Sequence, residues 1–189
     1  MELPIDLSAE MASEPLKLPS GMVVPIGKIN LRLASWNGLK EVLRGLPKTL
    51  AIKPLVDINN SPAFAEIAIV RILNAAGWKA CWIDSFHKCY RDDMPPQTTS
   101  LPDQITGQMQ TIRGRYVELL SQHPELRANR GEFGGAWDIV GWKASHMLFV
   151  EAKLAGKDRI RPSQLFWLQA GLDAGLSAGQ FVIAEWQVG

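Results

Sequence analysis

The stretch Met147-Leu148-Phe149-Val150-Glu151-Ala152-Lys153 decides the fold of this chain and marks its candidate site. It reads as a buried strand whose apolar run is interrupted near its end by a carboxylate and an ammonium. Side chains alternate between the two faces of a strand, so Glu151 and Lys153 share one face. Charged groups are costly to bury without a partner or a purpose. The pair therefore predicts either an ion pair at a strand end or a catalytic group.

A second interrupted strand precedes it at residues 137–140, where Asp138 stands among apolar residues. Residues 141–146 suit a hairpin turn, so we expect the two strands to pair antiparallel and to bring Asp138 beside Glu151. Two neighbouring carboxylates raise each other's pKa unless a cation lies between them. A hard divalent ion such as Mg²⁺ prefers such oxygen ligands. The alternative is that Asp138 caps the glycine-rich turn at residues 131–135.

A third carboxylate lies on a predicted helix that starts at Ser61-Pro62, a capping residue followed by proline, and stops at Gly77. At helical spacing, Glu66 falls on the same stripe as Ile69, Val70 and Leu73. A lone carboxylate on a core-facing stripe is either a first-turn residue favoured by the helix dipole or a third ligand for the same cation.

The loop that follows Lys153 is basic. Lys157, Arg159 and Arg161 alternate with other residues before a helix that begins at Pro162. Free backbone N–H groups at a helix start favour phosphate, and neighbouring cations reinforce this preference. Gln164, in the first turn, has an amide that can donate to a phosphate oxygen or to a metal-bound water. The alternative is a solvated basic loop.

Together the patterns predict one domain of the α/β class, a mixed β-sheet flanked by helices. Residues 1–60 are punctuated by proline and are expected to form an N-terminal arm packed on the core, with strands at 22–24 and 29–33 and a helix at 36–46. Residues 61–189 form the main domain, with an insertion at 88–130. The remaining expected elements are helix 61–76, strand 78–83, helix 104–121, strand 137–140, strand 147–153, helix 162–174 and strand 181–186. The expected core side of helix 104–121 carries Ile105, Met109, Ile112, Tyr116, Val117 and Leu120.

The composition sets the broad class. The chain has 189 residues, 47% of them hydrophobic and 21% charged, as in a globular protein. No apolar run approaches the roughly 20 residues that span a bilayer, so no membrane partner is expected. Two cysteines and no signal-peptide pattern predict a cytoplasmic protein. The net charge of +1 gives little support for nucleic acid.

Other constellations are weaker. Cys81, His87 and Cys89, with His123 or His146, match no zinc-ligand spacing, and free cysteines are commonly buried. There is no phosphate-binding GxxxxGK[ST] loop and no GxSxG nucleophile motif. Most of the tryptophans lie in apolar patterns. Those that could be exposed for base stacking are Trp36, Trp78 and Trp142.

The ordered set resembles the PD-(D/E)xK nuclease superfamily, and within it the VRR-NUC family. The set comprises Glu66 on its helix, Gly135-x-x-Asp138, Val150-Glu151-Ala152-Lys153 and the run from Arg159 through Arg161-Pro162-Ser163-Gln164 to Trp167-Leu168. It covers roughly residues 61–87 and 131–188. The chain departs from the pattern at Trp137, where proline is usual, and in the 88–130 insertion.

The resemblance implies a restriction-endonuclease-like fold and a metal-dependent nuclease that hydrolyses DNA phosphodiesters, an endonuclease for branched or structured DNA. It implies that Mg²⁺ or Mn²⁺ is held by Asp138, Glu151 and the Ala152 carbonyl, with Glu66 completing the acidic cluster. Lys153 would assist the attacking water and Gln164 would support the site. A homodimer is also implied.

The expected DNA contacts are Lys157, Arg159 and Arg161, joined by Arg113 and Arg115 on the insertion helix. Two alternatives stay open. The nuclease-like fold could serve as a non-catalytic nucleic-acid-binding or assembly module, or the insertion could carry an inhibitor or adaptor function.

Overall fold

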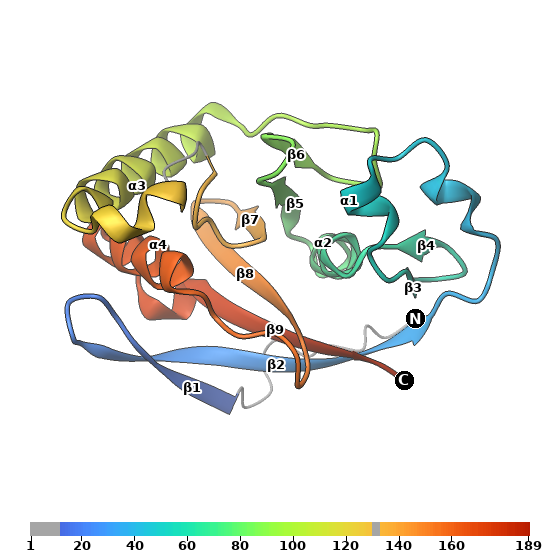
Figure 1. The fold of residues 1–189 in the computed structure, drawn as a ribbon, viewed down its shortest axis with the longest axis horizontal. Helices are drawn as coiled ribbons and strands as arrows, with labels where there is room; N and C mark the ends of the chain where they lie inside the picture. The colour runs from blue at the N-terminus through green and yellow to red at the C-terminus, as the bar shows by residue number, and fades with distance from the viewer. Residues whose placement is uncertain (1–11, 130–132) are drawn as a thin grey trace.

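The computed structural model describes residues 12–129 and 133–189 (Figure 1). Its helices are α1 (Lys48–Ala51), α2 (Ala65–Ala75), α3 (Asp103–Ser121) and α4 (Pro162–Asp173), with short 3-10 turns at Lys40–Leu43, Pro124–Asn129 and Ala178–Gln180. Its strands are β1 (Ala12–Lys17), β2 (Val23–Ser35), β3 (Val56–Asp57), β4 (Pro62–Ala63), β5 (Lys79–Asp84), β6 (Cys89–Arg91), β7 (Ile139–Lys143), β8 (His146–Leu154) and β9 (Phe181–Val188). None of the helices in these two ranges has the length and apolar character required to cross a membrane.

The strands form one mixed sheet in the order β4-β3-β2-β9-β8-β7-β5-β6, with β1 paired to β2. β9 runs parallel to both of its neighbours, β2 and β8. The other named pairs are antiparallel. The expected α/β class, a mixed sheet flanked by helices, is confirmed.

The sheet separates two apolar cores, because alternate residues of each central strand face opposite sides. In β8, Leu148 and Val150 join the core that contains α2, whereas Met147 and Phe149 join the core that contains α3 and α4. Figure 1 shows α3 and α4 together on one side of the molecule and α1 and α2 on the other. Helix α3, which lies within the segment 88–130, thus contributes to one of the two cores.

The central hairpin is antiparallel as predicted, but its bounds differ: β7 begins at Ile139, so Trp137 and Asp138 precede it, and of the turn expected at 141–146, residues 141–143 and 146 belong to the strands. β7 and β8 pair antiparallel, with Ile139 opposite Val150. One residue further along this register, Asp138 lies opposite Glu151. Helix α4 ends where predicted, followed by Gly175 with a φ of +92°. These elements are specified locally by the hairpin turn and by the proline and glycine that flank the helix.

Several expectations before residue 65 are wrong. Ser61-Pro62 does not start the helix, because Pro62 lies in β4 and α2 begins at Ala65 after an extended Phe64. The expected strands at 22–24 and 29–33 form one long strand, β2. Of the helix expected at 36–46, the structure has a 3-10 turn at Lys40–Leu43.

Residues 12–60, expected as an arm on the core, are hydrogen-bonded into the sheet through β2 and its neighbours. Residues 1–11 of that expected arm, and Gly131 of the expected glycine-rich turn, lie outside the described residues. In α3, Val117 was expected to face the core but is 44% exposed. The buried stripe of α3 is Ile105, Met109, Ile112, Tyr116 and Leu120.

Candidate functional site

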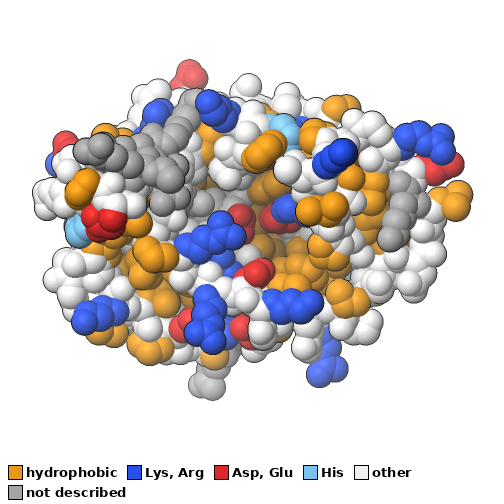
Figure 2. All heavy atoms as spheres, in the orientation of Figure 1, with side chains coloured by type: hydrophobic (Ala, Val, Ile, Leu, Met, Phe, Trp, Pro, Cys, Tyr) orange, Lys and Arg blue, Asp and Glu red, His pale blue; other side chains and the backbone are white. Residues whose placement is uncertain are grey.

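A pocket of about 770 Å³ opens where the carboxyl end of β8 meets the starts of α2 and α4. In Figure 2 it is a hollow near the centre of the face shown, with acidic side chains inside it and Lys and Arg side chains around it. The predicted site residues that line it are Glu66, Asp138, Glu151, Ala152, Lys153, Lys157, Arg159, Arg161 and Gln164. Segments far apart in the sequence therefore converge on one space.

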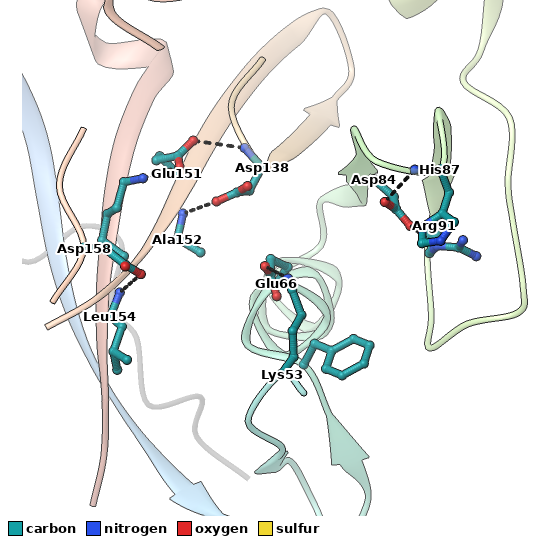
Figure 3. Close-up of polar contacts among 12 residues, drawn as sticks. Lys53, Glu66, Asp84, His87, Arg91, Asp138, Glu151, Ala152, Leu154 and Asp158 are labelled. Atoms are coloured by element: carbon teal, nitrogen blue, oxygen red, sulfur yellow. Dashed lines mark hydrogen bonds and ion pairs between the residues drawn. The ribbon is translucent and has the colours of Figure 1, made fainter. Parts of the chain in front are cut away.

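Asp138 and Glu151 are held across the hairpin by the backbone (Figure 3). The N–H of Asp138 donates to Glu151 Oε2 at 3.2 Å, and the N–H of Ala152 donates to Asp138 Oδ2 at 3.1 Å. Each carboxylate thus accepts a hydrogen bond from the strand that carries the other. This exchange fixes both carboxylates at the end of the β7–β8 ladder, where they face the pocket.

Burial raises the pKa of the Asp138 carboxyl well above its usual value, and the negative charges of Glu151 and Glu66 raise it further. The positive charge of Lys153 acts in the opposite direction but does not offset them. The acidic cluster therefore repels negative charge at Asp138. A bound cation would relieve this repulsion.

Lys153 and Gln164 hold Glu151 from the other side. Lys153 Nζ lies 2.7 Å from Glu151 Oε1 and 3.2 Å from Gln164 Oε1, and the Gln164 amide nitrogen donates to the same Glu151 oxygen at 2.5 Å. Glu151 is 1% exposed and Lys153 is 7% exposed, so this is a buried ion pair. Its partners place the lysine ammonium at the pocket wall.

The start of α4 is positioned by the same glutamine. The Arg161 N–H donates to Gln164 Oε1 at 2.9 Å, which satisfies a backbone donor at the beginning of the helix. The indole N–H of Trp137 donates to the backbone carbonyl of Gln164 at 3.2 Å. Trp137 therefore ties the strand that carries Asp138 to the helix that carries Gln164.

Glu66 enters the pocket from the first turn of α2, and its partner is a residue that the sequence did not suggest. Lys53 forms an ion pair with the Glu66 carboxylate. The Lys53 ammonium also lies over the rings of Trp82, at 4.7 Å, and Phe64, at 5.7 Å. Two aromatic faces and one carboxylate thus surround it, an arrangement that favours a cation.

The basic loop lies at the pocket edge in a defined conformation. The Leu154 N–H donates to Asp158 Oδ2 at 3.0 Å, which closes the turn after β8 (Figure 3). By contrast, Arg113 and Arg115 lie exposed on α3 and do not line the pocket. Arg115 forms an exposed ion pair with Glu118 at 3.0 Å. The structure does not bring these two arginines to the predicted site.

The pocket residues that were not singled out from the sequence include Lys53, Ser85 and Lys88. Lys53 precedes a proline in a segment without clear periodicity. Ser85 and Lys88 belong to the turn between β5 and β6, a hairpin whose second strand was expected to be loop. A strand of three residues is too short for the alternation of apolar and polar side chains to be recognised in the sequence.

The donor set fits a hard divalent ion that keeps much of its water. Asp138 and Glu151 offer two carboxylates, and Mg²⁺ is usually bound by one or two carboxylates together with water. Within residues 12–129 and 133–189, no three His, Cys, Asp or Glu side chains form a group that could hold a metal ion by themselves. An ion here would therefore depend on two carboxylates, the Ala152 carbonyl and water, with Glu66 drawn in from its ion pair with Lys53.

Comparisons of the chain with models of protein families, with curated proteins and with solved structures find no match.

Proposed function

We propose that this chain is a metal-dependent nuclease that hydrolyses DNA phosphodiester bonds, an endonuclease with a restriction-endonuclease-like fold. The observation that carries the proposal is the pairing of Asp138 and Glu151 at the end of one hairpin, where burial, and then the charges of Glu151 and Glu66, raise the Asp138 pKa. Lys153 on the same strand and Gln164 on α4 complete a set suited to phosphate and water.

Asp138, Glu151 and the Ala152 carbonyl would hold Mg²⁺ or Mn²⁺, and Glu66 would complete the acidic cluster. Such an ion would supply charge stabilisation to the phosphorane-like transition state and would lower the pKa of the attacking water. Lys153 orients that water and balances charge on the phosphate. Gln164 keeps the Lys153 ammonium and the Glu151 carboxylate in place.

The basic residues around the pocket support a DNA partner. Lys157, Arg159 and Arg161 lie on the loop beside the start of α4, where backbone N–H groups also favour phosphate. A cytoplasmic location and a homodimer, in which two pockets would meet two strands, belong to the same proposal.

The direct test is cleavage of plasmid, single-stranded, flap and four-way-junction DNA by the purified chain with Mn²⁺ or Mg²⁺. We expect cleavage of at least one substrate, lost on chelation and in Glu151→Gln. Absence of cleavage on all four substrates with both ions would contradict the proposal.

A second candidate is a non-catalytic DNA-binding or assembly module. It is favoured by the fact that Glu151 already has partners in Lys153, Gln164 and the Asp138 N–H. Calorimetry separates the two candidates. No heat of Mn²⁺ binding, together with DNA binding that survives Asp138→Ala, would support the module and exclude the nuclease.

A further inference from the structure

The turn between β5 and β6 comprises residues 85–88, and Figure 3 shows its neighbours Asp84 and His87 on one side of Asp138 and Asp158 of the basic loop on the other. Asp84 pairs with Cys89 at the end of the hairpin ladder, so the turn is short. Ser85 and Lys88 both line the pocket. Between them stands Phe86, which is 68% exposed.

This turn is held by a buried polar network (Figure 3). Asp84, 2% exposed, accepts hydrogen bonds from Arg91 Nε at 2.9 Å and from the His87 N–H at 3.1 Å, and lies 2.8 Å from His87 Nδ1. Arg91 is anchored further by the Gln97 carbonyl at 2.8 Å. These hydrogen bonds hold the turn in one conformation.

The network extends to the exposed aromatic side chain. The Phe86 and His87 rings meet edge to face, with centroids 4.9 Å apart. Because Asp84 holds His87, the Phe86 ring rests on a fixed partner while most of its surface faces solvent. Among the residues that the structure describes, Phe86 is the aromatic side chain that is exposed rather than buried or half-buried.

Lys88 adds a second unusual feature. Its φ is +55°, a left-handed conformation that is unfavourable for a residue with a Cβ and is normally taken by glycine or asparagine. The hairpin thus keeps a lysine where glycine would fit better. Ala144 in the β7–β8 turn has a similar conformation outside the pocket, whereas Lys88 lines the pocket, where its side chain can meet a phosphate.

The turn borders a pocket of about 770 Å³ that is lined by both cationic and acidic side chains. Its cationic lining residues are Lys53, Lys88, Lys153, Lys157, Arg159 and Arg161, against the acidic Glu66, Asp138, Glu151 and Asp158.

We infer that the 85–88 turn is a single-strand contact, in which Phe86 stacks on an unpaired base and Lys88 binds the adjacent phosphate. The inference rests on the proposed nuclease function and narrows its substrate to DNA that is unpaired at the site of cleavage. Stacking on an aromatic ring is tolerant of base identity, and a neighbouring cation tracks the backbone. The substrate would therefore be selected by strand separation rather than by sequence.

The test is binding of a fluorescent oligothymidine and of a blunt duplex, measured by anisotropy in EDTA so that nothing is cleaved. We expect Phe86→Ala to weaken single-strand binding about 5-fold to 100-fold, as for loss of one base stack, and duplex binding much less. Phe86→Trp should bind the single strand within about 2-fold of wild type, because the π face is kept.

Lys88→Gly separates recognition from folding. Glycine relieves the strained backbone, so the melting temperature should be unchanged or higher. The slope of log affinity against log salt should nevertheless shrink by about 0.7, the loss of one phosphate contact on a single strand. The matched controls are Lys143, the last residue of β7, and Ala144 in the β7–β8 turn, and neither lines the pocket. Ala144→Gly relieves a φ of +52°, and Lys143→Gln removes an exposed charge. Neither should change binding.

The outcomes distinguish this inference from the proposed function. Wild-type single-strand binding by Phe86→Ala and Lys88→Gly would overturn the inference, even for a protein that cleaves DNA. Equal losses for single strand and duplex would overturn the stacking role. Selective loss in a protein that binds DNA but never cleaves it would support the contact while contradicting the nuclease. Tighter binding to RNA of the same sequence would overturn the choice of DNA.

Discussion

The backbone N–H of Asp138 donates a 3.2 Å hydrogen bond to the Glu151 carboxylate across the β7–β8 hairpin. The spacing of the two carboxylates is therefore set by strand register and depends little on side-chain freedom. Lys153 and Gln164 complete the set from the same strand and from α4.

Glu151→Gln should abolish cleavage and also destabilise the protein. Glu151 is 1% exposed and neutralises the buried Lys153 ammonium at 2.7 Å. Leaving one partner of a buried pair uncompensated costs about 3–5 kcal/mol, and relief of the repulsion on Asp138 offsets part of this. We expect a net loss of about 2 kcal/mol in the free energy of unfolding, measured by urea denaturation.

The double variant Glu151→Gln with Lys153→Met is the control for that loss. It removes both charges and should recover most of the stability without recovering cleavage. A single variant as stable as wild type, or a double variant less stable than the single one, would contradict the role of the pair.

Asp138→Asn should change how the stability of the metal-free protein depends on pH. The Asp138 pKa is raised well above 3.8 in the folded state, mainly by burial and then by Glu151 and Glu66. An acid of this kind contributes stability that is fully present below its unfolded pKa and is lost as pH rises through the folded one. Asparagine cannot ionise, so the variant should lose less stability above pH 3.8. Urea denaturation in EDTA across pH measures this, and parallel wild-type and variant profiles would contradict it.

Lys53→Met should tighten the binding of Mn²⁺. Lys53 neutralises Glu66 at the edge of the acidic cluster, and methionine keeps the apolar contact with Trp82 without the charge. The pair is partly exposed, so its worth is at most about 1 kcal/mol, or roughly a 5-fold change in affinity. Calorimetry on Lys53→Met, with Lys143→Met as the exposed control, checks this. Unchanged or weaker Mn²⁺ binding by Lys53→Met would show that Glu66 does not contribute to binding of the ion.

Gly135→Ala should destabilise the fold much more than Gly175→Ala. Both glycines have positive φ, +73° and +92°. A Cβ on Gly135 would lie 2.4 Å from Tyr116 Oη and 2.6 Å from the Ser163 carbonyl, whereas one on Gly175 would meet nothing within 4 Å. We expect about 1 kcal/mol at Gly175 from the backbone alone and about 3 kcal/mol or more at Gly135 from the added overlap. Thermal melting measures the loss of stability in each variant. Equal losses would mean that the loop at Gly135 moves to accommodate the added methyl group at no cost in stability.

The sequence predicted the central part of the site because the residues of that part are close together along the chain. Glu151 and Lys153 share a strand, and Asp138 comes from the strand paired with it, so alternation and a hairpin turn place all three. Helix α4 was likewise delimited by Pro162 and Gly175. Glu66 was found through its position on an apolar stripe.

The remainder depends on tertiary contacts that periodicity does not show. Lys53 reaches Glu66 from a short helix and an irregular turn, and β2 joins β9 across the length of the chain. The prediction for Pro62 was wrong because a proline can occupy the first position of a helix or a place in an edge strand. The residues next to it in the sequence do not distinguish the two. The β5–β6 hairpin was missed because its strand β6 is three residues long.

The most direct test of the metal centre is the anomalous difference map of a crystal grown with Mn²⁺. We expect a peak in contact with the Asp138 and Glu151 carboxylates and the Ala152 carbonyl. A map from crystals with saturating Mn²⁺ that shows no peak between these two carboxylates would contradict it.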